Sequence, residues 1–353
     1  MTNDLTSPKR VLVTGATGFV GGRIAAALCT DGVDLRLLVR PSSNLDRLPS
    51  NVRDALAKES GDVELFEGDL TQQASLQGIC EGVDAVIHCA CAVKGTFDES
   101  QESQEIFIRV NVDGTRNLAG EIAQAGIRMV HLSSTAAMGP VTATEVDETT
   151  TCIPKAPYQI SKRRAEVALL EMHERDGLDV VILRPCLILG PGKDGGEPLE
   201  LFRLARWGLF PKIGGQMNQT KPLIDVRDVI QAATAALTRG RAGEIYLIHS
   251  DAGHTLDEIL DVARRLVGSG RSGVPVPVLP VRGVAHVFEA LAGVVGSFNP
   301  PITPGRLDLF LADRRISVAK ARRELGFDPQ VQDLFDMLGP TYVGYVRDGQ
   351  LND

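Results

Sequence analysis

A glycine-rich turn, Thr14-Gly15-Ala16-Thr17-Gly18-Phe19-Val20-Gly21, joins an apolar run at residues 11–13 to a segment whose apolar residues recur at helical spacing. Such a turn presents backbone N–H groups and the positive end of the helix dipole to an anion. Gly15 can adopt backbone angles forbidden to other residues, Gly18 lets a pyrophosphate approach, and Gly21 lets helix and strand pack closely. The turn therefore predicts a dinucleotide site formed by Gly15, Thr17, Gly18, Phe19, Val20 and Gly21, spaced GxxGxxG rather than GxGxxG.

Outward from this turn, strand and helix signals alternate along the chain. Short apolar runs predict further strands at residues 35–39, 63–67, 84–89, 129–133 and 180–183. Helical patterns lie between them, most clearly at residues 105–125 and 158–176. Strands that alternate with helices form right-handed βαβ units and a parallel sheet covered on both faces. The predicted fold class is α/β, a doubly wound parallel sheet of Rossmann type with a smaller C-terminal substrate-binding region.

The pattern changes after Pro191. Residues 199–207 predict a short amphipathic helix, and further strand and helix signals occur at 222–237, 244–249 and 255–267. Prolines at 275, 277 and 280, and again at 300, 301 and 304, mark turns or extended segments. We expect residues 1–190 to form the dinucleotide-binding domain, with 222–250 returning to it. Residues 191–221 and 251–353 then form mainly the substrate-binding region.

Bulk properties exclude several classes of protein. A net charge of −8 and a pI near 5.4 give no electrostatic basis for binding nucleic acid. The nearly apolar stretch at 281–298 is too short and too polar to span a bilayer, and a buried helix is favoured over a pocket wall or a membrane contact. The polar N-terminus lacks a signal-peptide pattern, so we expect a cytoplasmic protein. The six cysteines show no CxxC spacing, which predicts reduced, mostly buried thiols and no metal site.

Arg40 stands where cofactor choice is usually decided. About 20 residues beyond such a glycine turn, an acidic residue normally binds the ribose 2′-hydroxyl of NAD. A cation at this place favours the 2′-phosphate of NADP(H), with Ser43 adding a hydrogen bond, although a solvated arginine and NAD(H) remain the alternatives. Asp69, followed by Leu70 after the third strand, either accepts from the adenine amino group or caps a turn.

Tyr158 and Lys162 are spaced i, i+4 and so share one face of a helix. An ammonium near a phenol favours the phenolate, so we expect Lys162 to lower the pKa of Tyr158 from its usual value near 10. Tyr158 can then act as a general acid or base. The run Ser133-Ser134-Thr135 ends the fifth strand, at the carboxyl edge where such sheets bind ligands, and a hydroxyl there can hold a substrate oxygen.

In this order of motifs the sequence resembles the extended short-chain dehydrogenase/reductase family. The resemblance rests on five motifs: the glycine turn, Asn111-Val112-Asp113-Gly114-Thr115, Ser133-Ser134, Tyr158-Gln159-Ile160-Ser161-Lys162, and the run from Arg184 to Pro191. It implies that Ser134 binds the substrate oxygen, that Tyr158 is the acid/base, and that Lys162 tunes Tyr158 and holds the nicotinamide ribose. It implies a water-binding or helix-bending role for Asn111.

The same resemblance implies the remaining contacts. Cys89, Ala90 and Cys91 should lie near the cofactor ribose, and Ser133, Pro185, Leu187 and Ile188 near the nicotinamide. The substrate contacts expected beside Ser134 and Tyr158 are Val93, Thr135, Leu187, Phe202 and Trp207. A homodimer is expected by analogy, through a four-helix interface that uses residues 105–125 and 158–176. Redox chemistry at the cysteines is a lesser alternative to packing.

The C-terminal portion resembles the 3β-hydroxysteroid dehydrogenase-related branch, near the dihydroflavonol-reductase-like proteins. This resemblance rests on residues 300–304, residues 320–327 and Ala156-Pro157-Tyr158. It implies that the substrate is a secondary alcohol or ketone of a lipophilic small molecule, either steroid-like or polyketide-like. The first alternative is a nucleotide-sugar 4-epimerase with tightly bound NAD, because Arg203, Arg206 and Lys212 offer cations for a second pyrophosphate. Dehydratases generally carry an acidic residue beside the hydroxyl cluster, so Ala136, Ala137 and Met138 argue against dehydration but not against epimerisation. The second alternative is a redox sensor that binds NADP without turnover.

Overall fold

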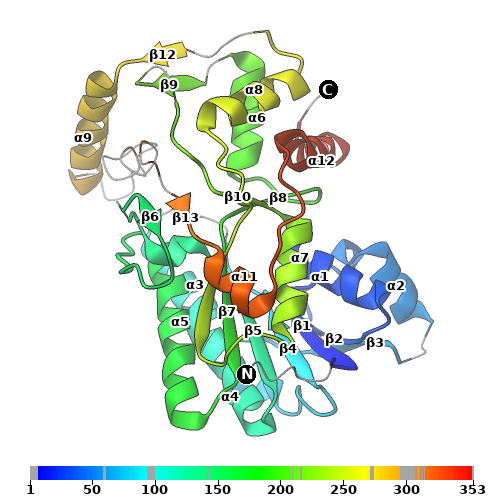
Figure 1. Cartoon of the computed structure of the whole chain (residues 1–353). Helices are drawn as coiled ribbons and strands as arrows, with labels where there is room; N and C mark the ends of the chain where they lie inside the picture. Colours follow the sequence, from blue (N-terminus) through cyan, green and yellow to red (C-terminus); the bar gives the residue numbers. More distant parts are fainter. Residues whose placement is uncertain are drawn as a thin grey trace.

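A seven-stranded sheet with the strand order β11-β7-β5-β4-β1-β2-β3 forms the centre of the molecule (Figure 1). The computed structural model describes residues 7–58, 61–93, 100–141, 143–208, 210–214, 217–270, 274–294, 307, 311, 313 and 315–351. Every neighbouring pair of strands in this sheet is parallel, which confirms the predicted class. The strands are β1 (Arg10–Thr14), β2 (Asp34–Val39), β3 (Val63–Glu67), β4 (Ala85–His88), β5 (Arg128–Leu132), β7 (Val180–Pro185) and β11 (Glu244–Ile248).

Helices cover both faces of the sheet, because alternate residues of each strand point to opposite sides. Val11 and Val13 of β1 lie in one buried cluster with residues of α1 (Phe19–Thr30), α2 (Ser50–Ala57), α7 (Val226–Ala236) and α11 (Ala319–Leu325). Leu12 lies in a second cluster with residues of α4 (Gly114–Ala125) and α5 (Pro157–Asp176). The strand order reverses between β1 and β4, and open sheets of this kind bind ligands in the crevice at that point.

A second group of elements lies beyond the carboxyl edge of the sheet (Figure 1). It has its own apolar core, which includes Phe202, Leu260 and Met337. Its elements are α6 (Glu197–Trp207), β9 (Pro211–Ile213), α8 (Leu256–Leu266), β12 (Val274–Val276), α9 (Val278–Val294) and α12 (Leu334–Arg347). We call this group the C-terminal lobe. Two small parallel pairs lie between it and the sheet, namely β8 (Leu187–Leu189) with β10 (Leu223–Asp225) and β6 (Glu145–Val146) with β13 (Arg315–Ile316).

The chain returns to the sheet after its first visit to the lobe, as predicted for residues 244–249. β11 pairs with β7 at the edge of the sheet, with Tyr246 beside Leu183. The helix expected at 105–125 begins earlier, at α3 (Gln101–Phe107), because the Ser100 side chain accepts from the N–H of Ser103 and caps it. It continues through a π-helical turn, Ile108–Asp113, into α4. The exact domain boundaries stay a prediction.

The apolar stretch at 281–298 forms a helix over its described part, but the expectation that it is buried is wrong. Val284 and Val287 of α9 are 48% and 58% exposed, whereas Ala285 is buried. The apolar side chains are spread around the helix, so packing one face leaves others in solvent. The prolines expected to mark a turn at 300, 301 and 304 lie outside the described residues. Within the described ranges, no helix is long and apolar enough to cross a membrane.

All six cysteines are unpaired, as expected for reduced thiols. Only Cys186 is buried, and the other five are partly buried, so the expectation of mostly buried thiols is correct for one of them alone.

Candidate active site

The glycine turn is packed so closely that Gly15 and Gly21 have no room for a side chain. Gly15 has φ +75°, and a Cβ atom added there would lie 2.8 Å from the backbone nitrogen of Ala90, which follows β4. A Cβ on Gly21 would overlap the carbonyl oxygen of Gly15. The N–H of Gly18 donates to that same carbonyl at 2.9 Å. Within the described residues no side chain caps α1 at Gly18, so the helix N-terminus presents open N–H groups that fit a pyrophosphate.

A network of hydrogen bonds among buried polar side chains lies next to the start of the glycine turn, at the ends of β1 and β4. The hydroxyl of Thr14 lies 2.7 Å from Nδ1 of His88 and accepts from the Ala90 N–H at 3.1 Å. The other ring nitrogen of His88 lies 3.0 Å from the hydroxyl of Thr115. Burial lowers the pKa of His88 to about 3, so the ring is neutral at physiological pH. Sequence analysis missed this network, which joins the ends of β1 and β4 to α4.

Arg40 follows β2, the strand next to β1, and is exposed. Its N–H donates to the hydroxyl of Ser43 at 3.0 Å, and the N–H of Ser43 donates back to the Arg40 carbonyl at 2.9 Å. These two bonds close a tight turn. Across the part of the chain that the structure describes, the Arg40 guanidinium forms no ion pair, so it is available to an anionic ligand. The turn from Arg40 to Ser43 could hold a nucleotide phosphate because the Arg40 guanidinium is unpaired and β2 lies next to β1, which leads into the glycine turn.

Asp69 adopts the turn-capping arrangement, one of the two alternatives that its sequence context allows. Its Oδ1 accepts from the N–H and from the hydroxyl of Thr71, each at 2.8 Å. Leu70 is buried, and its carbonyl accepts from the Asn117 side chain at 2.8 Å. An adenine contact by Asp69 stays a prediction.

Tyr158 and Lys162 lie on one face of α5, as their spacing predicts, and both are close to Cys91. Pro157 occupies the first turn of this helix, where its missing N–H costs nothing. The Tyr158 ring packs edge-on against Phe107, with centroids 5.7 Å apart. The Lys162 ammonium is buried, donates to the Leu132 carbonyl at 2.8 Å and lies 3.9 Å from the Cys91 sulfur. The structure thus joins the predicted acid/base pair to the end of β5.

The pKa of Tyr158 is raised well above its ordinary value near 10, firstly by burial and then by the neighbouring Cys91 thiol. The expectation that Lys162 lowers this pKa is therefore wrong for the structure. The physical reason is that desolvation of the phenolate dominates, while the Lys162 ammonium is directed to the Leu132 carbonyl. Tyr158 consequently holds its proton at neutral pH and is suited to donate it.

Asn111 lies in the π-helical turn, and its side chain forms hydrogen bonds with the loop after β4 and with α5. Its Nδ2 donates to the Ala92 carbonyl at 3.2 Å and to the Ser161 hydroxyl at 3.1 Å, and its Oδ1 accepts from the Ala92 N–H at 2.7 Å. These bonds tie the loop after β4 to α5 at the residue before Lys162. Asn111 thereby fixes the segment that carries Cys91.

The three hydroxyl residues at the end of β5 have different surroundings. Ser134 is partly exposed, and its Oγ accepts from the Ala136 N–H at 3.1 Å. Thr135 is also partly exposed. Ser133 is buried; its hydroxyl donates to Glu166 at 2.5 Å, and its N–H donates to the Leu183 carbonyl at 2.8 Å. A contact between Ser133 and the cofactor would therefore fall to its carbonyl oxygen, and a substrate contact by Ser134 stays a prediction.

Glu166 and Arg184 form a buried ion pair that sequence analysis missed. The Arg184 Nη2 lies 2.7 Å from Oε2 of Glu166, and the two side chains are 1% and 0% exposed. Two signals were present in the sequence. Glu166 follows Tyr158 and Lys162 at the next helical repeat, and Arg184 is a charged residue inside an otherwise apolar strand.

The residues predicted to contact nicotinamide and substrate lie in several parts of the structure and differ in their exposure. Pro185 ends β7 and is buried, and Leu187 and Ile188 in β8 are partly buried. Phe202 is completely buried against the ring of Tyr342, with centroids 5.3 Å apart, inside the core of the C-terminal lobe. Val93 and Trp207 are 54% and 65% exposed. Substrate contacts by these side chains stay a prediction, and Phe202 reaches no open surface of the lobe.

Comparison with known proteins gives consistent matches. A family model described as the NAD dependent epimerase/dehydratase family matches residues 11–248. Sterol demethylase protein B from Methylococcus capsulatus is 32% identical over 90% of this chain and 93% of its own length. A 4-hydroxy-2-methyl-3-oxo-4-farnesyl-3,4-dihydroquinoline-1-oxide ketoreductase from Stigmatella aurantiaca is 28% identical over 95% of this chain and 98% of its own.

The crystal structure of gox2253 superimposes with a TM-score of 0.80 and 27% identity, covering 98% of this chain and 100% of that one. The family model and the sterol demethylase relative both extend over most of the chain, and the residues matched by the family model include the glycine turn, Tyr158 and Lys162. The protein therefore belongs to the NAD-dependent epimerase/dehydratase family, the extended type of short-chain dehydrogenase/reductase, and is an NAD(P)-dependent enzyme.

Proposed function

We propose that this enzyme is an NADP-dependent oxidoreductase that interconverts a secondary alcohol and a ketone on a lipophilic small molecule, with Tyr158 as the general acid/base. The observation that carries the proposal is the partly buried Tyr158, whose phenol holds its proton, one helical turn from Lys162 and close to Cys91 at the carboxyl edge of the sheet. Ser134 lies on the short helical turn that packs against α5, where its hydroxyl can hold the substrate oxygen.

The chain's own groups account for the proton chemistry. A bound nicotinamide supplies or accepts the hydride, and the glycine turn, Arg40 and Lys162 would hold that dinucleotide. Ser134 binds the ketone oxygen and polarises it. Tyr158 then donates its proton to that oxygen as the carbonyl is reduced, and it takes the proton back when an alcohol is oxidised. Lys162, fixed by the Leu132 carbonyl, contributes a positive charge that balances the phenolate formed after donation.

Two observations support a lipophilic ketone over a nucleotide sugar. The relatives described above include a sterol demethylase protein and a farnesyl-dihydroquinoline-oxide ketoreductase. Two of the cations that a second pyrophosphate would need are engaged elsewhere, since Arg203 pairs with Glu200 at 2.7 Å and Lys212 with Asp257 at 2.8 Å. The nucleotide-sugar 4-epimerase remains the second candidate, favoured by the family model.

A substrate panel tests the proposal. The purified full chain is incubated with NADPH or NADH and a set of steroid, polyketide-like and short aliphatic ketones, and dinucleotide oxidation is followed by absorbance. We expect NADPH oxidation with apolar ketones. Interconversion of UDP-sugars without net dinucleotide oxidation, together with NAD that co-purifies with the protein, would replace the proposal with the epimerase.

Arg40 is proposed to select NADP, and exchanging its charge tests this. In Arg40→Asp we expect the ratio of kcat/KM for NADPH over NADH to fall at least ~10-fold, because a charge-assisted hydrogen bond contributes about 1.5–3 kcal/mol and each 1.4 kcal/mol is tenfold. Arg53→Asp is the matched control, since Arg53 is another exposed arginine, on α2. An unchanged ratio in Arg40→Asp would show that Arg40 does not contact the 2′-phosphate.

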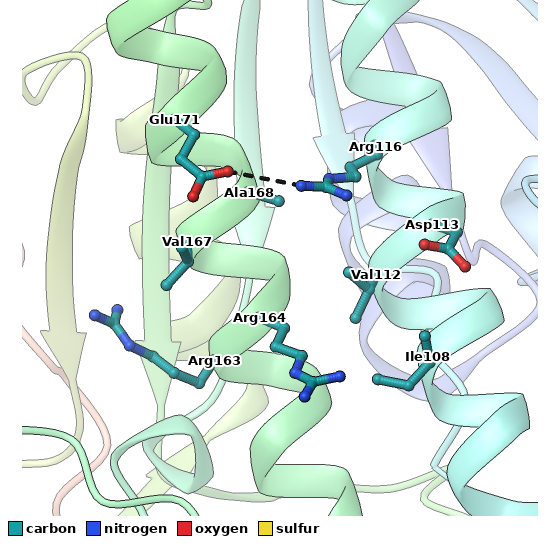
Figure 2. Close-up of a pocket in the computed structure, with 9 residues that line it drawn as sticks. All are labelled: Ile108, Val112, Asp113, Arg116, Arg163, Arg164, Val167, Ala168 and Glu171. Atoms are coloured by element: carbon teal, nitrogen blue, oxygen red, sulfur yellow. Dashed lines mark ion pairs between the residues drawn. The ribbon is translucent and has the colours of Figure 1, made fainter.

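We also propose that the enzyme is a homodimer through α4 and α5. Figure 2 shows a groove between these helices, with apolar Val112 and Val167 in its walls and an ion pair between Arg116 and Glu171 at 3.6 Å across it. Val167 is 37% exposed, so it offers apolar surface to a partner. A second copy of the same helix pair would cover this groove by the packing of a four-helix bundle.

Charge placed in the groove tests the dimer. We expect Val167→Glu to convert the protein to a monomer at micromolar concentration, because burying an unpaired carboxylate in an interface costs several kcal/mol. Val343→Glu on α12 is the control, since Val343 is 62% exposed and lies outside the groove. Sedimentation velocity reports the mass. A monomeric unsubstituted chain, or a Val167→Glu dimer, would contradict the assignment.

A further inference from the structure

Glu166 is the centre of a buried network that meets three elements of the active site. Its Oε1 accepts from the Ser133 hydroxyl at 2.5 Å and from Nε of Arg184 at 2.8 Å. Its Oε2 accepts from Nη2 of Arg184 at 2.7 Å and from Nη1 of Arg163 at 3.2 Å. Both carboxylate oxygens are thus satisfied without solvent, since the side chain is completely buried.

The network connects parts of the chain that carry the reacting groups. Tyr158, Lys162 and Glu166 follow one another at intervals of four residues on α5, so they share one face of the helix. Lys162 donates to the Leu132 carbonyl, and Glu166 accepts from the next residue, Ser133. Two successive residues at the end of β5 are therefore fixed to α5, directly before Ser134.

The third connection is to β7. Arg184 is the residue before Pro185, which ends that strand where the cofactor is expected. Its two hydrogen bonds to Glu166 hold the ends of β5 and β7 in one register with the helix. Replacing a buried ion pair with apolar residues of similar volume is often neutral or stabilising, so stability alone does not require charges here. A polar network whose central carboxylate has hydrogen bonds on both oxygens, as that of Glu166 has, instead fixes orientation.

We propose that Glu166 is a positioning residue, and that it acts through Ser133 to hold the Ser134 hydroxyl in line with Tyr158. This inference rests on the proposed function of Tyr158 and Ser134. The hydroxyl of Ser134 sits at the start of a short helical turn, held by the Ala136 N–H, and has no other anchor among the described residues. Its place is therefore set by the backbone of Ser133. A displacement of about 1 Å at a reacting group can cost ~10²-fold in rate.

Ser133→Ala isolates this connection, because it leaves the Arg184–Glu166 ion pair intact and removes only the bond to the strand. We expect kcat for ketone reduction to fall about tenfold, since a displaced Ser134 holds the ketone oxygen in a less reactive geometry. The NADPH Kd, measured by fluorescence, should stay within about twofold, because the glycine turn and Arg40 are untouched. An unchanged kcat, or an equal loss in cofactor affinity, would overturn the inference.

A double-substitution cycle separates positioning from a general structural role. If Ser133 acts through Ser134, then adding Ser133→Ala to Ser134→Ala causes no further loss of kcat beyond about twofold. A merely structural role would lower kcat by the same factor in both backgrounds, and that result would overturn the proposal. Ser317→Ala serves as the matched control, because the Ser317 hydroxyl accepts from the N–H of Ala319 and lies outside this network.

A measurement that needs no substrate keeps the two proposals distinguishable. Amide hydrogen exchange of residues 134–138 in Ser133→Ala should be at least ~10-fold faster than in the unsubstituted chain, because the segment loses its anchor. Unchanged exchange overturns the positioning role whether or not the enzyme reduces ketones. Faster exchange in a protein that turns over no ketone would support the anchor and reject the proposed reaction.

Discussion

Replacing Tyr158 with phenylalanine is expected to lower kcat for ketone reduction by at least ~10²-fold, the usual scale for losing a positioned acid. Phenylalanine preserves the ring that packs edge-on against Phe107 at 5.7 Å, so the fold around α5 should persist. Only the hydroxyl is removed. If the proposed glycine turn and Arg40 hold most of the dinucleotide, the NADPH Kd should change by less than about threefold.

The physical basis of this effect is the protonation state of the phenol. Burial and the Cys91 thiol raise the pKa of Tyr158 well above its ordinary value, so the proton-bearing form is present throughout the neutral range. Below that pKa the donor is fully loaded, and donation to the substrate oxygen requires no prior uptake from solvent. Without the hydroxyl, the nascent alkoxide has no donor at the required place.

The measurement pairs rate with binding. Single-turnover oxidation of NADPH by an active ketone gives the chemical rate, and quenching or enhancement of NADPH fluorescence gives the Kd. Tyr342→Phe is the matched control, because Tyr342 packs its ring against Phe202 in the C-terminal lobe, remote from α5. Full activity in Tyr158→Phe would remove this residue from the mechanism.

The sheet could be predicted from sequence because its determinants are local. Each strand is a short apolar run, and the glycine turn predicts a tight connection between the first strand and the first helix, which the structure has. The close approach of Gly15 to Ala90 was not predicted and appears only in the structure. The return of β11 to the sheet was also predictable, since residues 244–249 carry a strand signal after a helix. Periodicity of this kind needs no knowledge of tertiary contacts.

What could not be predicted depends on burial. The sequence shows Tyr158 near an ammonium, which suggests a lowered pKa, but the opposite shift arises from desolvation that only the folded chain defines. Glu166 is one of several charged residues on α5, and its place one helical repeat after Lys162 does not by itself show that Ser133, Arg163 and Arg184 enclose it. Likewise, which apolar side chains of α9 are exposed depends on which face of the helix packs against the rest of the protein, and the sequence alone does not specify that face.

Arg184→Met is expected to reduce the free energy of unfolding by about 3–5 kcal/mol, because it leaves a buried carboxylate without its main partner. Arg116→Met provides the contrast. Arg116 pairs with Glu171 at 3.6 Å, but both side chains are more than half exposed, so a loss below about 1 kcal/mol is expected. Urea unfolding followed by circular dichroism measures both. Equal losses in the two variants would contradict the view that burial makes the Arg184–Glu166 pair costly to break.

A double substitution takes the same prediction further. Glu166→Leu combined with Arg184→Met removes both charges together, so most of the lost stability should return, as happens when apolar residues replace a whole buried ion pair. The rate of ketone reduction should not return with it, because the Ser133 hydroxyl still lacks its acceptor. Stability without turnover would indicate that the charges are kept for the geometry of the site. Recovery of both would indicate that the network serves only to fill the space between α5, β5 and β7.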